Sequence, residues 1–240
     1  MWLLWSAATI CAFFVKGLCG FANTLVFTTI LSFGNNHVNI SPVELLLGYP
    51  TNIILAWKER RSIQWKVCIP LALMVIAGSI PGALFLKTAD SSIVKLFFGA
   101  VIIVIGLEML LREFQTKKMK ESKLFLGVIG VLSGVLCGLF GIGALLGAYI
   151  SRVTDNSSSF KANICVVFLV ENTFRIILYS IWDIITVNTL KQAVILLPLV
   201  IAGLLLGIFS GKFLNEKTIQ KLVSILLVLS GISLIFNVLH

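Results

Sequence analysis

The chain has 240 residues, of which 58% are hydrophobic and 12% are charged, and its mean hydropathy is +1.05. Because the hydrophobic residues form runs of about 20, the length that crosses a bilayer core, this composition excludes a water-soluble globular domain and indicates one polytopic membrane domain. The formal net charge is +9, but the basic residues lie in short loops between the hydrophobic runs. This placement favours a role in membrane orientation and argues against nucleic-acid binding.

Two segments are too long for ordinary membrane spans. Residues 2–33 and 123–150 would extend about 48 and 42 Å as straight helices, whereas a bilayer core measures about 30 Å. Both contain glycines near the middle, in the sequences KGLCGFA (16–22) and CGLFGIGA (137–144). We therefore expect each segment to form a broken helix that enters the membrane as a re-entrant hairpin.

Six further segments have the length of ordinary spanning helices: 42–57, 67–86, 92–111, 162–182, 192–211 and 218–239. Ser41 and Pro42 predict the start of the first of them, as an N-cap followed by a first-turn proline. Glu44 and Glu108 lie near predicted helix ends, where we expect them to be solvated or at the lipid interface. With the two broken segments, this makes an all-α polytopic membrane protein of eight helical segments.

The two halves of the chain resemble each other at an offset of 120 to 125 residues. The matches pair Gly17 with Gly138, Gly20 with Gly141, Asn52 with Asn172, GSIPG (78–82) with GLLLG (203–207), Lys87 with Lys212 and Gly106 with Gly231. This pattern predicts a first repeat at 1–111 and a second at 123–240, joined by a basic cytoplasmic linker at 112–122.

Loop charges favour an inverted arrangement of the two repeats. If both broken segments cross the membrane fully, the Lys and Arg residues in loops divide ten against seven. If both are re-entrant, they divide fourteen against three, with only Lys87, Lys95 and Lys191 on the poorer side. The positive-inside rule favours the second division, so we expect inverted repeats, each with one re-entrant hairpin and three spanning helices.

Under this topology the glycine-rich tips of the two hairpins meet near the membrane midplane. Non-helical backbone is tolerated there when it lines a cavity, and the half-helix after each tip points its amides and positive dipole end inward. We therefore expect an anion site to include the backbone of Gly17, Gly20, Gly138, Gly141 and Gly143. Close packing of helices on small residues is the alternative explanation for these glycines.

Polar side chains within the predicted spans extend this site. Glu171, Asn172 and Arg175 lie near the centre of segment 162–182, where charged residues usually mark a pathway or a pair. Glu171 and Arg175 are four residues apart and can pair on one helix face, which leaves other N–H groups of Arg175 for a bound oxyanion. We also assign Glu171 a role in proton coupling.

Neutral donors and a second cation complete the predicted binding site. Asn172 and its repeat mate Asn52 would face the same central cavity, although hydrogen bonding between helices is an alternative for Asn52. Lys16 and Asn23 flank the first tip. Lys16 either adds a second positive charge to the site or extends toward a membrane interface.

The glycine motifs resemble those of the sulfite exporter (TauE/SafE) family. GVLCGLFGIGALLGAYIS (134–151) is similar to the second glycine-rich signature of that family, and GLCGFANTLVF (17–27) resembles a weaker copy in the first half. The resemblance implies secondary transport of small anions, chiefly sulfur oxyanions and organosulfonates. Family members usually have a denser glycine run followed by a proline, where this chain has Gly143-Ala144-Leu145 and Phe21-Ala22-Asn23.

We therefore expect a multi-pass transporter of the inner (cytoplasmic) membrane that moves a small anion, such as a sulfur oxyanion or organosulfonate, by alternating access. Its partners would be that solute and membrane lipid, with no cofactor, metal or nucleic acid and no enzymatic activity; monomer and homodimer both stay open. One alternative is a transmembrane thiol-disulfide electron carrier that uses Cys19 and Cys137, although these do not align in the repeats. The other is a non-transporting membrane scaffold.

Overall fold

A computed structural model describes residues 2–32, 37–88, 90–112, 123–140, 143–154, 156–211 and 213, together with 221, 224, 225, 228, 231, 232, 235 and 236. Gly141, most of the predicted linker 112–122 and most of the predicted helix 218–239 lie outside the described residues. The elements of the described part are helical, with no strand among them, which confirms the all-α fold class.

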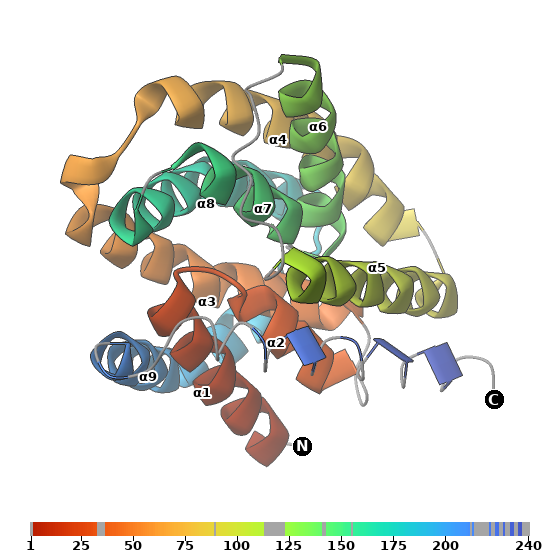
Figure 1. Cartoon of the computed structure of the whole chain (residues 1–240). Helices are drawn as coiled ribbons and strands as arrows, with labels where there is room; N and C mark the ends of the chain where they lie inside the picture. The colour runs from red at the N-terminus through yellow and green to blue at the C-terminus, as the bar shows by residue number, and fades with distance from the viewer. Residues whose placement is uncertain are drawn as a thin grey trace.

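Figure 1 shows the helices of the described residues. They are α1 (Trp2–Cys19), α2 (Asn23–Ser32), α3 (His37–Lys58), the 3-10 turn η1 (Arg60–Ser62), α4 (Trp65–Thr88), α5 (Ser91–Arg112), α6 (Lys123–Phe140), α7 (Ala144–Val153), α8 (Ser157–Ile181) and α9 (Val187–Ser210). Among the described residues, α1, α4, α8 and α9 are long and apolar enough to cross a membrane.

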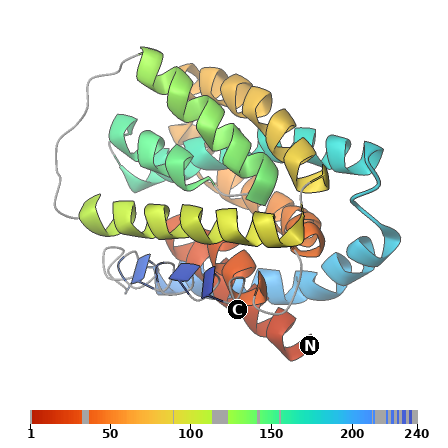
Figure 2. The same cartoon turned by 90° about the vertical axis from the view of Figure 1, so that its right-hand side faces the viewer.

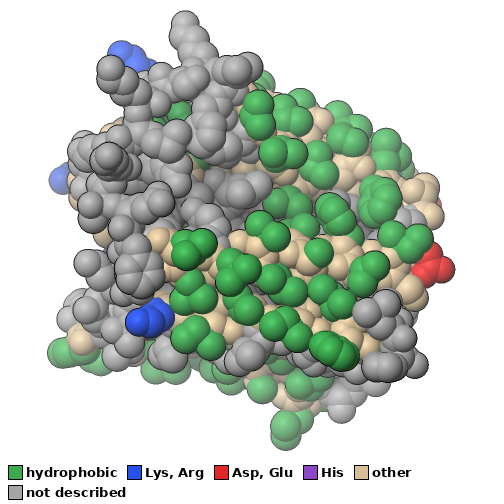
Figure 3. Space-filling view, turned by 45° about the vertical axis from the view of Figure 1, so that its right-hand side comes forward, with side chains coloured by type: hydrophobic (Ala, Val, Ile, Leu, Met, Phe, Trp, Pro, Cys, Tyr) green, Lys and Arg blue, Asp and Glu red, His purple; other side chains and the backbone are tan. Residues whose placement is uncertain are grey.

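The outer surface is apolar, as a bilayer requires. Leu3, Val104 and Ile181 are 85%, 66% and 68% exposed, respectively. Figure 3 shows hydrophobic side chains over most of the coloured part of one face, with few charged side chains, which lie toward its edges. A surface of this kind is stable against lipid rather than water, so the helices support a multi-pass membrane protein.

Both long segments are interrupted, as expected. The first breaks between the end of α1 at Cys19 and the start of α2 at Asn23, and the second between Phe140 and Ala144. Each break therefore lies at the C-terminal side of its glycine cluster, because Gly17 and Gly138 are still within the preceding helices. At the first break Gly20 has φ +84° and Ala22 has φ +72°, both in the left-handed region.

Ala22→Gly should stabilise the protein, because an L-residue in the left-handed region is strained by about 1–2 kcal/mol. Glycine adopts this backbone conformation without that cost, although a buried methyl group is lost. The thermal midpoint of the purified variant in detergent should rise by a few degrees over wild type. Gly20→Ala is the matched control and should lower the midpoint, since its new Cβ would lie 2.6 Å from Lys161 Cγ at φ +84°. Equal midpoints for both variants would contradict this prediction.

The predicted start of the third helix is wrong. We expected it at Pro42 with Ser41 as its cap, but α3 begins at His37 and contains Pro42 as its sixth residue. Proline has a helical φ and lacks only its N–H, so near a helix start it removes one backbone hydrogen bond without ending the helix. The Ser41 hydroxyl instead lies 3.2 Å from the Tyr179 hydroxyl of α8.

The helices are arranged as two outer pairs around a central crossing. Figures 1 and 2 show α4 beside α6 on one side and α1 beside α9 on the other, with α3 and α8 between them. Glycines allow close contact within each outer pair. A Cβ on Gly17 of α1 would lie 2.4 Å from the Leu204 carbonyl oxygen of α9, and one on Gly138 of α6 would lie 2.4 Å from the Ser79 carbonyl oxygen of α4.

The two interruptions lie close together along α8. Gly20 contacts Lys161 near the start of α8, and Gly143 faces the Phe168 ring seven residues further on, about 10 Å along the helix axis. In both interrupted segments the second helix reverses direction: α2 runs back along α1, and α7 runs antiparallel to α8. Trp5 and Phe27 rings lie 5.7 Å apart, which returns α2 toward the start of α1.

The hairpins also start at opposite ends of the molecule. The end that holds Lys58, η1 and the beginning of α8 is called here the basic end. Gly147 of α7 contacts Ile164 of α8, so α7 runs back toward the basic end. In contrast, α1 and α9 run parallel, since Ile10 contacts Gly203. The first segment therefore begins at the end where α9 begins, which is opposite the basic end.

Candidate functional site

A cluster of polar side chains is buried where α3 and α8 cross and where the start of α2 approaches them. Each of its side chains belongs to a residue that is at most 8% exposed. The cluster consists of Lys16 from α1, Asn23 and Thr24 from α2, Glu44 from α3, and Glu171, Arg175 and Tyr179 from α8. Burial of four charged side chains of opposite sign within membrane helices is costly, which makes this cluster the candidate functional site.

Arg175 connects three helices of this cluster. Its Nε lies 3.6 Å from Glu171 Oε1, so the i, i+4 pair expected from the sequence is present. Its Nη2 lies 3.9 Å from Glu44 Oε2 on α3, and its Nη1 donates to the Cys137 carbonyl in the last turn of α6. The guanidinium therefore also neutralises the negative end of a helix dipole at the second interruption.

Tyr179 completes the cap on the end of α6. Its hydroxyl donates to the Gly138 carbonyl at 3.0 Å, one residue beyond the carbonyl that Arg175 binds. The carbonyls in the last turn of a helix have no partner within that helix. Arg175 and Tyr179 therefore hold the end of α6 in place just before the second interruption.

The carboxylate of Glu44, a residue of α3, lies against the N-terminus of α2. Asn23 Nδ2 and Thr24 Oγ1 both donate to Glu44 Oε1, at 2.5 and 2.7 Å. Asn23 and Thr24 are the first two residues of α2, so the carboxylate lies at the positive end of this helix dipole. The expectation that Glu44 is solvated or at the lipid interface is wrong, because it was based on a helix start five residues too late.

Lys16 is directed into the protein rather than toward an interface. Its Nζ donates to the Gly48 carbonyl of α3 at 3.4 Å and lies 6.0 Å from the centre of the Phe13 ring. A Cβ on Gly48 would lie 3.3 Å from Glu44 Oε1 and 3.5 Å from Asn23 Nδ2. Lys16 therefore approaches the same carboxylate that Asn23 binds.

The structure brings some predicted site residues together and leaves others apart. Lys16, Asn23, Glu171 and Arg175 belong to the cluster, and Gly138 contributes its carbonyl to it. Asn52 and Asn172 are also buried. Asn52 lies one helical turn after Gly48, and Asn172 directly follows Glu171. The remaining glycines contact other parts of the chain: Gly17 the backbone of α9, Gly20 the Lys161 side chain, and Gly143 the Phe168 ring.

Sequence reasoning missed Glu44, Thr24, Tyr179 and Ser79, whose hydroxyl donates to Glu171 at 3.4 Å. One signal was available for Glu44. An acidic residue inside a membrane helix indicates a functional position, and an earlier predicted helix start would have placed Glu44 inside its helix. The hydroxyl residues carry no such signal, since serine, threonine and tyrosine are common in membrane helices of any role.

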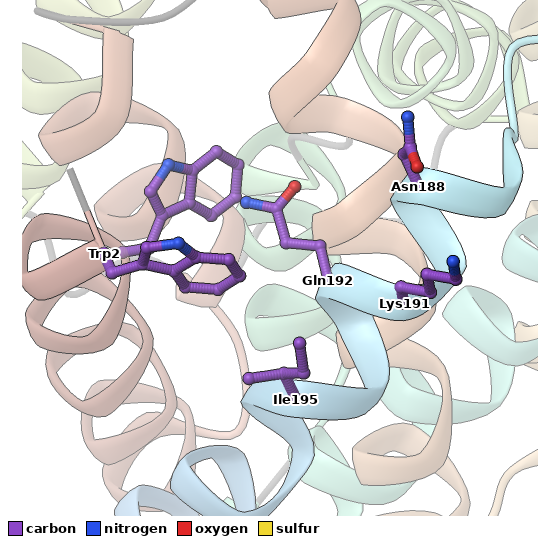
Figure 4. A pocket seen from close by; sticks show the side chains of 6 residues that line it. Trp2, Asn188, Lys191, Gln192 and Ile195 are labelled. Carbon is purple, nitrogen blue, oxygen red and sulfur yellow. The ribbon is translucent and has the colours of Figure 1, made fainter.

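A separate pocket of about 410 Å³ opens between the starts of α1 and α9 (Figure 4). It is lined by Trp2, Trp5, Asn188, Lys191, Gln192 and Ile195. Figure 4 shows the side chains of Trp2 and Gln192 facing each other across it from the two helices. The pocket thus combines indole rings with one cation and two amides, at the end of the molecule opposite the basic end.

An apolar layer separates this pocket from the buried cluster. Trp5 and Lys16 are eleven residues apart on α1, about 16 Å along its axis. Between them Phe13 packs in one core cluster with Trp5, Phe27 and Leu196. The polar site is therefore closed toward the pocket in this conformation.

Comparison with known proteins assigns the chain to a family. The family model of the sulfite exporter TauE/SafE matches residues 5–234. A protein named probable sulfite/organosulfonate exporter TauE, from Cupriavidus necator, is 28% identical over 200 residues, which cover 75% of this chain and 77% of that protein. No solved structure gives a significant match. The chain therefore belongs to the sulfite exporter TauE/SafE family, whose members are membrane exporters and not enzymes.

Proposed function

We propose that this protein is a secondary transporter of the cytoplasmic (inner) membrane that exports a small sulfur oxyanion or organosulfonate by alternating access around the buried cluster. One observation carries this proposal: the cluster already holds an anionic group. Two side-chain donors at the start of α2 bind the Glu44 carboxylate, and Arg175 faces its other oxygen. The donors and charges that hold a carboxylate also suit a sulfite or sulfonate group.

One donor of the cluster and one polar atom of the neighbouring Asn52 have no hydrogen-bond partner among the described residues. Arg175 Nε has no hydrogen-bond partner among the described residues, and its 3.6 Å separation from Glu171 is an ion pair rather than a hydrogen bond. Asn52 Oδ1 also has no partner there, and exchange of the amide O and N positions would present a donor instead. Buried polar groups without partners are rare in folded proteins and favour a site that binds a polar ligand.

We therefore propose Lys16, Asn23, Asn52, Asn172 and Arg175 as ligands of the solute, with Glu171 or Glu44 coupling proton movement. The tips at Gly20 and Gly143 contact α8 at Lys161 and Phe168, on the N-terminal side of Glu171 and Arg175. The contacts of Gly17 and Gly138 support the alternative explanation for those two residues, close packing of helices.

The helix contacts support inverted repeats at 1–111 and 123–240. In such a pair of repeats α1, α3 and α4 correspond to α6, α8 and α9. The contact between α1 and α9 then corresponds to that between α6 and α4, and the crossing of α3 and α8 corresponds to itself. Rocking of one repeat against the other would open the cluster first toward the basic end and then toward the pocket at the starts of α1 and α9.

Flux measurements test this function. The purified protein should release preloaded sulfite or a small alkanesulfonate from proteoliposomes, with a rate that saturates as the internal concentration rises. A carboxylate with the same carbon skeleton and protein-free liposomes are the controls. A scaffold protein would give the same flux as protein-free liposomes for every solute, and that result would overturn the proposal.

Cys19→Ala combined with Cys137→Ala should keep anion flux within about twofold of wild type, because a solute carrier requires no thiol chemistry. All five cysteines lie in described helices, and none of them forms a disulfide there. Cysteines buried in apolar surroundings are usually packing residues. Flux of the double variant is compared with wild type under reducing and oxidising conditions. Loss of activity with normal thermal stability would favour the electron-carrier alternative instead.

A further inference from the structure

The occupant of the anion site is the protein's own carboxylate. Glu44 accepts hydrogen bonds from Asn23 and Thr24 and faces Arg175, at the position where a solute anion would gain most from the start of α2. We infer that Glu44 is an internal competitor, which the solute displaces from this site when a proton neutralises Glu44. This inference rests on the proposed function and adds the group that couples proton movement to anion binding.

The charges of the cluster set the stoichiometry of this exchange. Lys16 and Arg175 are balanced by Glu44 and Glu171, so the buried groups sum to zero when all four are ionised. These residues are each at most 3% exposed, so water offers little compensation for an added charge. Entry of a monoanion would leave a net negative charge that is uncompensated, and such a charge is costly when buried. One proton on Glu44 restores neutrality, so one proton accompanies each monoanion.

Geometry favours Glu44 over Glu171 as the group that exchanges. Glu171 shares α8 with Arg175, lies one turn away and receives a further hydrogen bond from Ser79. It therefore moves together with Arg175. Glu44 comes from α3 and its nearest contact with Arg175 is longer, at 3.9 Å. A small separation of α3 from α8 would detach Glu44 from Arg175 and leave the Glu171 pair intact.

Other titratable groups around the cluster fit the same role for Glu44. Lys16 approaches it from α1, Glu171 and Arg175 from α8, and the Tyr179 ring packs against Arg175. From α6 the Cys137 carbonyl binds Arg175. Protonation of Glu44 removes its attraction for both cations at once. The two cations then exceed the single remaining carboxylate, which favours an incoming anion.

Glu44→Gln provides the decisive variant, because glutamine keeps the shape and the acceptor oxygen but cannot bind a proton. In proteoliposomes, wild-type flux of an alkanesulfonate should fall between pH 6 and pH 8 and should not respond to a membrane potential set with potassium and valinomycin. Flux through Glu44→Gln should be independent of pH and should follow the membrane potential, because the anion then crosses without a proton. Glu59→Gln neutralises a carboxylate outside the cluster, at the N-cap of η1. It is the matched control and should keep the pH dependence and the indifference to potential.

Each outcome has a distinct meaning. A Glu44→Gln variant that stays pH-dependent and electroneutral would overturn the inference, as would a switch to potential-driven flux in Glu59→Gln. Absence of saturable flux in the wild type would overturn the proposed function, and this inference with it. A second measurement does not depend on the folding of a variant. Binding of the alkanesulfonate to the wild-type protein in weakly buffered detergent should take up about one proton per anion, and no uptake would contradict the inference.

Discussion

Arg175→Ala is expected to lower saturable anion flux about 100-fold or more. Arg175 is the cation that faces both carboxylates and holds the end of α6 through the Cys137 carbonyl. Removal of one partner from a buried charge pair typically costs about 3–5 kcal/mol, and each 1.4 kcal/mol corresponds to a tenfold change in an equilibrium. Flux is measured in proteoliposomes as initial rate against internal sulfite concentration.

Stability must be separated from function in this experiment, since two unpaired carboxylates would remain buried. The triple variant Arg175→Gln, Glu44→Gln, Glu171→Gln removes the charges together and should recover most of the thermal midpoint without recovering flux. Arg175→Lys keeps a charge but loses the planar fork that can bind two groups at once, so intermediate flux is expected. Flux close to wild type in Arg175→Ala would contradict the assignment of this residue to the site.

Gly138→Ala is expected to destabilise the protein strongly. The new Cβ would lie 2.4 Å from the Ser79 carbonyl oxygen and 2.9 Å from the Ala83 nitrogen, both backbone atoms of α4 that cannot turn aside. Overpacking of this kind typically costs about 1–3 kcal/mol, and here it would also displace the Gly138 carbonyl that Tyr179 binds. The thermal midpoint of the purified variant should fall by several degrees.

The same helix offers a matched control. An added Cβ on Gly127 of α6 would meet no other described part of the chain within 4 Å, and alanine is a better helix residue than glycine by about 1 kcal/mol. Gly127→Ala should therefore keep or raise the thermal midpoint, whereas Gly138→Ala lowers it. Equal effects of the two substitutions would show that α6 does not pack closely against α4 through Gly138.

The glycines illustrate how one sequence pattern can serve two structural purposes. We predicted that Gly17 and Gly138 lie at the hairpin tips, because they open the glycine clusters. In the structure both lie within helices and face a neighbouring helix, while α1 and α6 end later, at Cys19 and Phe140. Sequence alone could not separate these uses, since the absence of a Cβ permits both a turn and a close contact.

The sequence by itself determined the membrane class, the two interrupted segments and the Glu171–Arg175 pair. All three depend on local properties: run length, the conformational freedom of glycine, and the i, i+4 spacing of a helix. Only the tertiary structure decided that Glu44 lies between Asn23, Thr24 and Arg175 and that Tyr179 caps α6. These contacts join residues far apart in the chain, and their distances depend on how α2, α3, α6 and α8 pack, which no spacing within one helix encodes.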